Sequence, residues 1–164
     1  MNQLHLLQQL YGTVLIPEAV YQELTDPDFL VAGAKEVQTF TWIQIRAVED
    51  RTMVKALSSE LDPGEAEAIV LALEMKAEQV LIDERRGRII AAKLNLHYTG
   101  ILGVLVEAKS QGFISTVKPL LIRSSNRGFI STVKPLLDDL INKAGFWVAE
   151  PLYKSVLLLV NETK

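Results

Sequence analysis

The sequence predicts an α/β fold in which a short, mostly parallel sheet lies between helices. Apolar residues make up 49% of the chain, which is enough for an ordinary buried core. Short β-branched or apolar runs alternate with longer segments of helical spacing, and this alternation is typical of a parallel sheet covered on both faces. The chain has 164 residues, so we expect residues 1–164 to form a single domain.

The first six elements follow from the spacing of apolar residues. They are a helix beginning near Leu4, a strand at Thr13–Ile16, helices at 17–24 and 28–38, a strand at 41–48 and a weak helix at 49–58. Alternation of apolar and polar residues supports the strand at 41–48. Pro17 favours a helix start, because its missing N–H needs no partner in the first turn.

The middle of the chain opens a second series of elements with a capping-box pattern. Asp62 is expected to be the N-cap, Pro63 the first helical residue and Glu65 the third. The buried stripe of this helix is expected to be Ala68, Leu71, Ala72 and Met75. The later elements are a strand at Gln79–Ile82, a helix at 84–94, a short strand at Leu96–Thr99, a helix at Gly100–Lys109, a strand at Phe146–Ala149 and a helix at 151–160.

Acidic side chains mark the carboxyl end of the predicted sheet. Glu65 lies in the first turn of its helix, and Asp83 follows the next strand. Ligands of open α/β sheets bind at this end, and carboxylates gathered there suggest a divalent cation and phosphate chemistry. Taken one by one, these acids favour a structural interpretation, in which Glu65 and Asp83 cap helices and Glu23, Glu67 and Glu84 are surface acids.

A basic cluster follows Asp83. Arg85, Arg86, Arg88 and Lys93 are expected to form a solvated helix face with i,i+4 pairs, or to hold RNA phosphates beside an acidic metal site. The formal net charge is −3, so a nucleic-acid binder of this composition needs such a local patch or a metal ion.

Several classes of protein are disfavoured. The chain has no cysteine, which excludes disulfides and thiolate chemistry and fits a reducing cytoplasm. A Rossmann-like small-ligand binder would need a phosphate-cradling glycine loop, and none is found. No apolar run reaches the roughly 18 residues of a membrane span, and the N-terminus has no basic region of a signal peptide.

A ten-residue motif, GFISTVKPLL, occurs at 112–121 and again at 128–137, with a period of 16. In one straight helix, a shift of 16 residues would rotate the second copy by about 160° relative to the first. The two copies therefore cannot both bury the same face of a single helix. We interpret this as a single duplication in a domain that needs one copy. The second copy is expected to fill the native core and the first to contact another subunit, which gives a homo-oligomer.

Four segments of the sequence form a distinctive series. They are I-P-E-A-V-x-x-E-L, D-P-G-E-A-E-A-I-x-L-A, V-L-I-D-E-R-x-G-R and T-G-I-L-G-V-L-V-E-A-K. Together they resemble the PIN-domain family, and more narrowly the small prokaryotic PIN-like proteins related to toxin–antitoxin ribonucleases. The resemblance implies a three-layer sandwich, Mg²⁺ or Mn²⁺, and hydrolysis of RNA phosphodiesters. It implies that the metal-binding, catalytic acids are Glu23, Glu65 and Asp83. Residues of secondary or RNA-contacting role are then Glu84, Arg85, Arg88 and Thr99.

The family pattern begins with a central strand that ends in an Asp or Asn, and this sequence begins after that point. The first central strand and its acid are therefore expected to be absent. The resemblance then implies a toxin-type ribonuclease that is impaired in this form. The alternative is a decayed, non-catalytic PIN-like protein that binds an antitoxin-like partner or itself.

Overall fold

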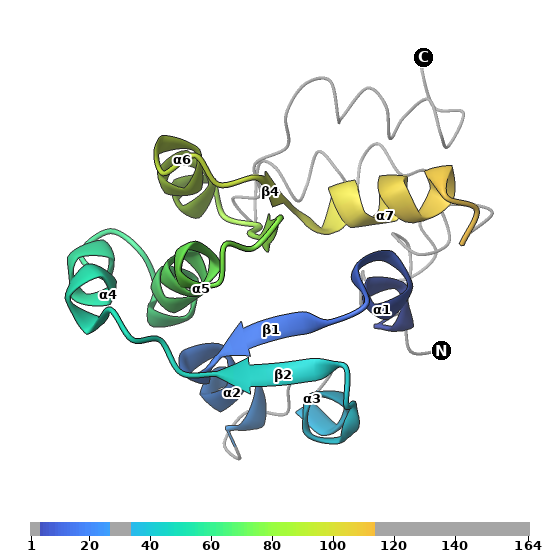
Figure 1. Ribbon diagram of the computed structural model, residues 1–164, viewed down its shortest axis with the longest axis horizontal. Coiled ribbons are helices and arrows are strands. Elements are labelled where there is room, and N and C mark those ends of the chain that lie inside the picture. Colours follow the sequence, from blue (N-terminus) through green and yellow to red (C-terminus); the bar gives the residue numbers. More distant parts are fainter. Residues whose placement is uncertain (1–3, 27–33, 114–164) are drawn as a thin grey trace, which may run out of the picture. The chain divides into compact units, whose positions relative to one another are not determined.

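The computed structural model describes residues 4–26 and 34–113 (Figure 1). The chain divides into two compact units, one of Met1–Ile82 with Arg86–Tyr98 and the other of Asp83–Arg85 with Thr99–Lys164. Helices and short strands alternate along the described chain, which confirms the predicted α/β class.

The predicted elements are found in the predicted order across the described residues. They are α1 (His5–Tyr11), β1 (Val14–Pro17), α2 (Glu18–Thr25), α3 (Ala34–Thr39), β2 (Ile43–Arg46), α4 (Arg51–Leu57), α5 (Pro63–Glu74), β3 (Val80–Leu81), α6 (Arg85–Lys93), β4 (Tyr98–Thr99) and α7 (Ile101–Ser110). The predicted elements at 146–149 and 151–160 lie outside the described residues, as do 28–33 and all of the repeat beyond Phe113.

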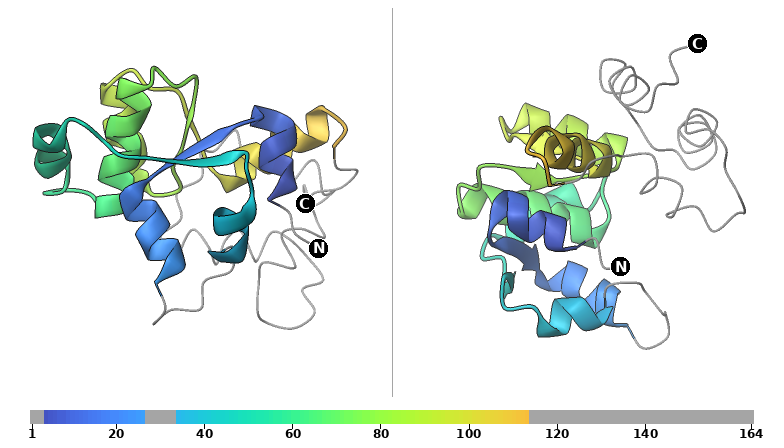
Figure 2. Two further views of the ribbon diagram at one scale, coloured as in Figure 1. Left: turned by 60° about the horizontal axis from the view of Figure 1, so that its bottom comes forward. Right: turned by 90° about the vertical axis from the view of Figure 1, so that its right-hand side faces the viewer.

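The first sheet pairs β1 with β2 in parallel, from Val14 opposite Ile43 to Pro17 opposite Arg46. Helices α2 and α3 lie on one side of these two strands (Figure 2). In the described residues, β3 and β4 form a separate two-stranded sheet, so the expected single sheet is present there as two pieces. The N–H of Val80 donates to the carbonyl of His97 at 2.9 Å.

Helix α5 is the centre of the first unit, because α2, α4, β1 and β3 all contact it. Ile69 is fully buried and Val70 is 1% exposed, whereas Met75 is 49% exposed. The predicted buried stripe is therefore wrong at Met75, because α5 ends at Glu74 and Met75 is only its C-cap. The main core cluster consists of Leu61, Ala66, Ile69, Ala72, Val80, Ile82, Ile90 and Ala91.

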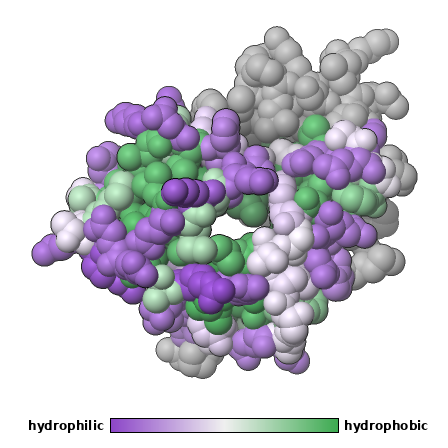
Figure 3. Space-filling view, in the orientation of Figure 1, coloured by the Kyte–Doolittle hydropathy of each residue, from purple (hydrophilic) through white to green (hydrophobic). Residues whose placement is uncertain are grey.

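Hydrophobic side chains also lie at the surface between hydrophilic ones (Figure 3). Ile45 on β2 is 40% exposed and Leu81 on β3 is 39% exposed. Each two-stranded sheet thus keeps an apolar side chain in contact with solvent. None of the described helices is both long enough and apolar enough to cross a membrane.

Two helix starts differ from prediction. Pro17 is the last residue of β1 and the N-cap of α2, so that helix begins at Glu18. Asp62 is the N-cap of α5 in extended backbone conformation, but its side chain makes no capping hydrogen bond. The Asp62 half of the predicted capping box is therefore wrong, and the helix start depends on Pro63 in its first turn.

Candidate functional site

The carboxylate of Glu23 lies against the first turn of α5. A Cβ atom built at Gly64 would lie 2.9 Å from Oε1 and 3.0 Å from Oε2 of Glu23. Gly64 is the second residue of α5 and is buried, whereas Glu23 is an exposed residue near the end of α2. A negative charge is favourable here, because the first N–H groups of a helix have no partner within it and carry partial positive charge.

Glu65 follows Gly64 directly and points to another glycine. A Cβ atom built at Gly87 would lie 2.9 Å from Oε1 of Glu65 and 2.7 Å from Cγ2 of Ile82. Gly87 belongs to the first turn of α6, and Oε2 of Glu65 is shielded from solvent. In the first unit, the carboxylate of Glu23 on α2 therefore lies beside Gly64, and the carboxylate of Glu65 on α5 lies beside Gly87. Both glycines are in the first turn of a helix.

The third predicted acid, Asp83, is partly buried and belongs to the second unit. Its Oδ1 accepts a hydrogen bond of 3.0 Å from the N–H of Ile101, the first residue of α7. The sequence suggested that Asp83 would cap the helix that follows it. The structure shows it instead bound to the start of a helix 18 residues further along the chain.

Thr99 also lies in the second unit, where it precedes α7. Its hydroxyl oxygen occupies the space that a side chain at Gly103 would need. The glycine at this position therefore allows α7 to pack closely against Thr99.

Helix α6 does not present all of its basic residues to solvent. Glu84 and Arg85 are exposed, but Arg88 is only 7% exposed and its Nε donates to the carbonyl of Ile82 at 2.7 Å. The expected solvated face is therefore wrong for Arg88, because its guanidinium binds the end of the β3 segment. The exposed basic residues of this cluster are Arg85, Arg86 and Lys93.

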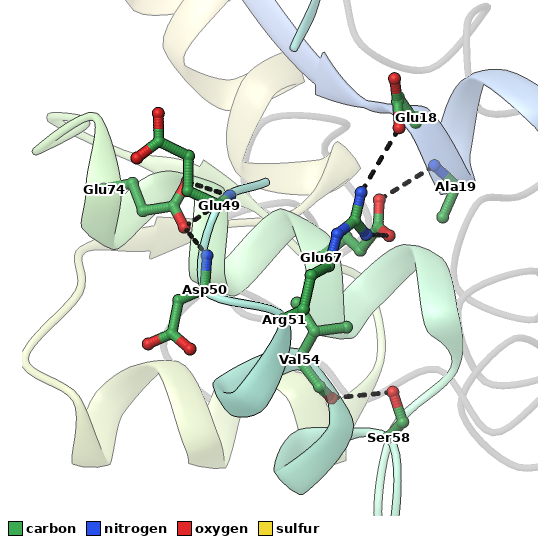
Figure 4. A network of polar contacts seen from close by, with 9 residues as sticks. All are labelled: Glu18, Ala19, Glu49, Asp50, Arg51, Val54, Ser58, Glu67 and Glu74. Atoms are coloured by element: carbon green, nitrogen blue, oxygen red, sulfur yellow. Dashed lines mark hydrogen bonds and ion pairs between the residues drawn. The ribbon is translucent and has the colours of Figure 1, made fainter. Parts of the chain in front are cut away.

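Sequence reasoning missed Glu67, which was expected to be a surface acid and is 7% exposed. Its Oε2 accepts a 3.0 Å hydrogen bond from the N–H of Ala19 in the first turn of α2, and its Oε1 pairs with Arg51 (Figure 4). Arg51 also lies 3.4 Å from Glu18. The sequence did contain a signal for the buried role of Glu67, because this acid stands in an otherwise apolar run of α5.

Glu74 acts in the same way at the other end of α5. Its Oε1 accepts from the N–H of Glu49 at 3.0 Å and from that of Asp50 at 2.7 Å (Figure 4). Both N–H groups precede α4, whose own N-cap, Asp50, accepts from Met53 at 2.9 Å. Glu67 and Glu74 therefore support the fold, which leaves Glu23 and Glu65 as the acids of the first unit beside the glycines.

The acids Glu23 and Glu65 suit a hard divalent cation, since all of their donor atoms are carboxylate oxygens. Within residues 4–26 and 34–113, no group of three or more His, Cys, Asp or Glu side chains is arranged to hold a metal ion. Mg²⁺ keeps several water ligands and commonly uses only one or two carboxylates. Glu23 and Glu65 are of the ligand type and number that such a partly hydrated ion uses.

The comparisons with known proteins agree with this chemistry. The family described as PIN domain matches residues 1–124. No curated protein and no solved structure matched the chain. PIN domains are in general nucleases that bind RNA and depend on divalent metal ions. Since the match spans well over half of the sequence, this chain belongs to the PIN-domain family.

Proposed function

We propose that this protein is a toxin-type endoribonuclease that depends on Mg²⁺ or Mn²⁺ and uses the carboxylates of Glu23, Glu65 and Asp83. The observation that supports the proposal is that the carboxylates of Glu23 and Glu65 each lie beside a glycine in the first turn of a helix. Carboxylate oxygens gathered at helix starts are suited to bind a cation.

A divalent ion, when bound, lowers the pKa of a water ligand and offsets the negative charge of the phosphate. Glu23 and Glu65 would bind the ion through carboxylate oxygens. The hydrogen bond from Ile101 orients the carboxylate of Asp83. The exposed Arg85, together with Glu84 and Thr99, would lie along the RNA. A local positive charge is needed for this contact, because the whole chain carries a net charge of −3.

A non-catalytic function is the second candidate. In this alternative the domain binds an antitoxin-like protein or a second copy of itself. It is favoured by the lack, among the described residues, of a group of three potential ligands arranged around one ion. The two candidates differ in whether the protein turns over RNA.

Hydrolysis of a fluorescently labelled single-stranded RNA in the presence of Mn²⁺ tests the proposal. We expect cleavage by the wild-type chain, loss of cleavage with EDTA, and at least a 100-fold lower rate for Glu65→Gln, in line with about 10²–10³ for one lost electrostatic contact. Glu78→Gln, at an exposed acid beyond the end of α5, is the control and should cleave normally. Equal cleavage by Glu65→Gln and the wild type would rule out this site, and no cleavage by the wild type would favour the binding function.

A further inference from the structure

We infer that Gly64 and Gly87 are positioning residues, which fix where the carboxylates of Glu23 and Glu65 lie. The inference deepens the proposed function and rests on it, because it concerns the same two acids. It assigns a role to two residues that do not themselves bind metal or substrate.

The backbone does not require glycine at either position. Among the described glycines, only Gly12 and Gly112 have positive φ, at 69° and 79°. Gly64 and Gly87 have ordinary helical backbone, in which alanine is the more favourable residue. The reason for glycine at these two positions must therefore be the space around them.

At Gly64 that space is filled by the carboxylate of Glu23. The three atoms nearest to a built Cβ all belong to Glu23: Oε1 at 2.9 Å, Oε2 at 3.0 Å and Cδ at 3.2 Å. Any side chain at this position would push the carboxylate away from the first turn of α5. Because Glu23 is exposed, its side chain could swing outward without disturbing the core.

At Gly87 the space is shared between the carboxylate of Glu65 and the side chain of Ile82. A built Cβ would meet Oε1 of Glu65 at 2.9 Å and Cδ at 3.2 Å, and also Cγ2 of Ile82 at 2.7 Å. Ile82 is 4% exposed, so an added methyl group would disturb the core as well as the carboxylate. Gly64 is therefore the position at which carboxylate placement can be changed separately from packing.

The test compares Gly64→Ala with the wild type in the metal-free full chain. Titration calorimetry with MnCl₂ measures affinity, and circular dichroism measures the thermal midpoint. We expect Gly64→Ala to bind Mn²⁺ about 10- to 100-fold more weakly, which is the usual cost of removing an orienting contact around a metal site. Its thermal midpoint should stay the same or rise, because alanine favours the helix.

Two further variants make the result specific. Gly12→Ala is the matched control, because nothing lies within 4 Å of its built Cβ but its φ of 69° is unfavourable for alanine. It should lose stability and keep its Mn²⁺ affinity. The double variant Gly64→Ala/Glu23→Asp shortens the acid by one methylene group, so it should regain part of the Mn²⁺ affinity. If Gly64→Ala alone does not fold, the affinity of this double variant is measured in its place.

The outcomes separate the inference from the proposed function. Wild-type affinity in Gly64→Ala, together with weak binding by Glu23→Gln, would overturn the role of the glycine and leave the metal site intact. Failure of the double variant to recover affinity would also overturn it. A wild-type chain with no affinity for Mn²⁺ would overturn the metal site and the positioning role together.

Discussion

At the scale of residues, three glutamates of α5 have three different environments. Glu65 reaches a glycine of α6, Glu67 is buried between α2 and Arg51, and Glu74 binds the backbone before α4. The amino acid and its helix are the same in all three cases. What differs is the element that packs beside each residue, and this decides which groups each carboxylate meets.

Glu67→Gln should destabilise the first unit. The amide keeps one acceptor but removes the charge that binds both Arg51 and the N–H of Ala19. We expect a loss of about 1–2 kcal/mol in the free energy of unfolding, since the Arg51 side chain is 52% exposed and water screens the ion pair. Urea unfolding followed by circular dichroism measures this change.

Glu18→Gln is the matched control, because it touches the same Arg51 at 3.4 Å with a side chain that is 50% exposed. Its effect should stay below about 1 kcal/mol, as for exposed ion pairs in general. An unfolding free energy of Glu67→Gln equal to that of Glu18→Gln would show that burial does not strengthen the Glu67 contacts.

At the scale of elements, local sequence signals placed most of the described helices and strands within a few residues. The strand predicted at Thr13–Ile16 is β1, at Val14–Pro17, and the helix predicted at Gly100–Lys109 is α7, at Ile101–Ser110. The burial of Arg88 could not be read from local spacing. It depends on a hydrogen bond to Ile82, which becomes possible only after α6 has packed beside the β3 segment.

The same limit applies to the candidate site. The position of Asp83 after a strand was predicted, but its hydrogen bond to Ile101 joins residues 18 apart, beyond the reach of periodicity. The approach of Glu23 to Gly64 joins α2 to α5 and is likewise a tertiary contact. Sequence alone could suggest these acids as ligands, but not the glycines that make room for them.

Variants of Asp83 should separate its structural role from its proposed catalytic role. Asp83→Asn keeps an oxygen that accepts from the N–H of Ile101, because asparagine and aspartate are nearly equal as helix caps. Asp83→Ala removes the acceptor and should lower the unfolding free energy by about 1 kcal/mol. If the carboxylate binds the metal, both variants should lose Mn²⁺-dependent RNA cleavage, although only Asp83→Ala is less stable.

Thermal unfolding and the RNA assay, made on the same preparations, check this prediction. Normal cleavage by Asp83→Asn would show that Asp83 is only a cap of α7. A loss of stability in Asp83→Asn equal to that in Asp83→Ala would instead show that the charge, and not the acceptor, stabilises the helix start.

At the scale of the whole molecule, the sequence contains two copies of an apolar motif, and the family match includes one of them. The family match ends at residue 124, after the first copy of GFISTVKPLL and before the second. The match thus includes the copy at 112–121, whereas the sequence led us to assign the native core to the copy at 128–137. Which copy fills the core stays a prediction. Under either assignment, the other copy has no place in the native core.

The surplus copy predicts self-association. Each copy brings five large apolar residues, and each of them costs about 1.5–3 kcal/mol if it is exposed rather than buried. We therefore expect the full chain to form a dimer or a larger oligomer in which one copy of the motif contacts a second subunit. Deletion of residues 112–127 removes one period and leaves a single motif directly after Gln111, so this variant should be monomeric.

Multi-angle light scattering at protein concentrations of tens of micromolar measures both masses. The control is a full-length chain with Phe113→Ser and Phe129→Ser, which keeps the length and weakens the apolar faces of both copies equally. A monomeric wild-type chain would contradict the prediction. If the deletion variant associated as strongly as the wild type, the oligomer would depend on another surface, because removing the duplicated residues would then have left the interface intact.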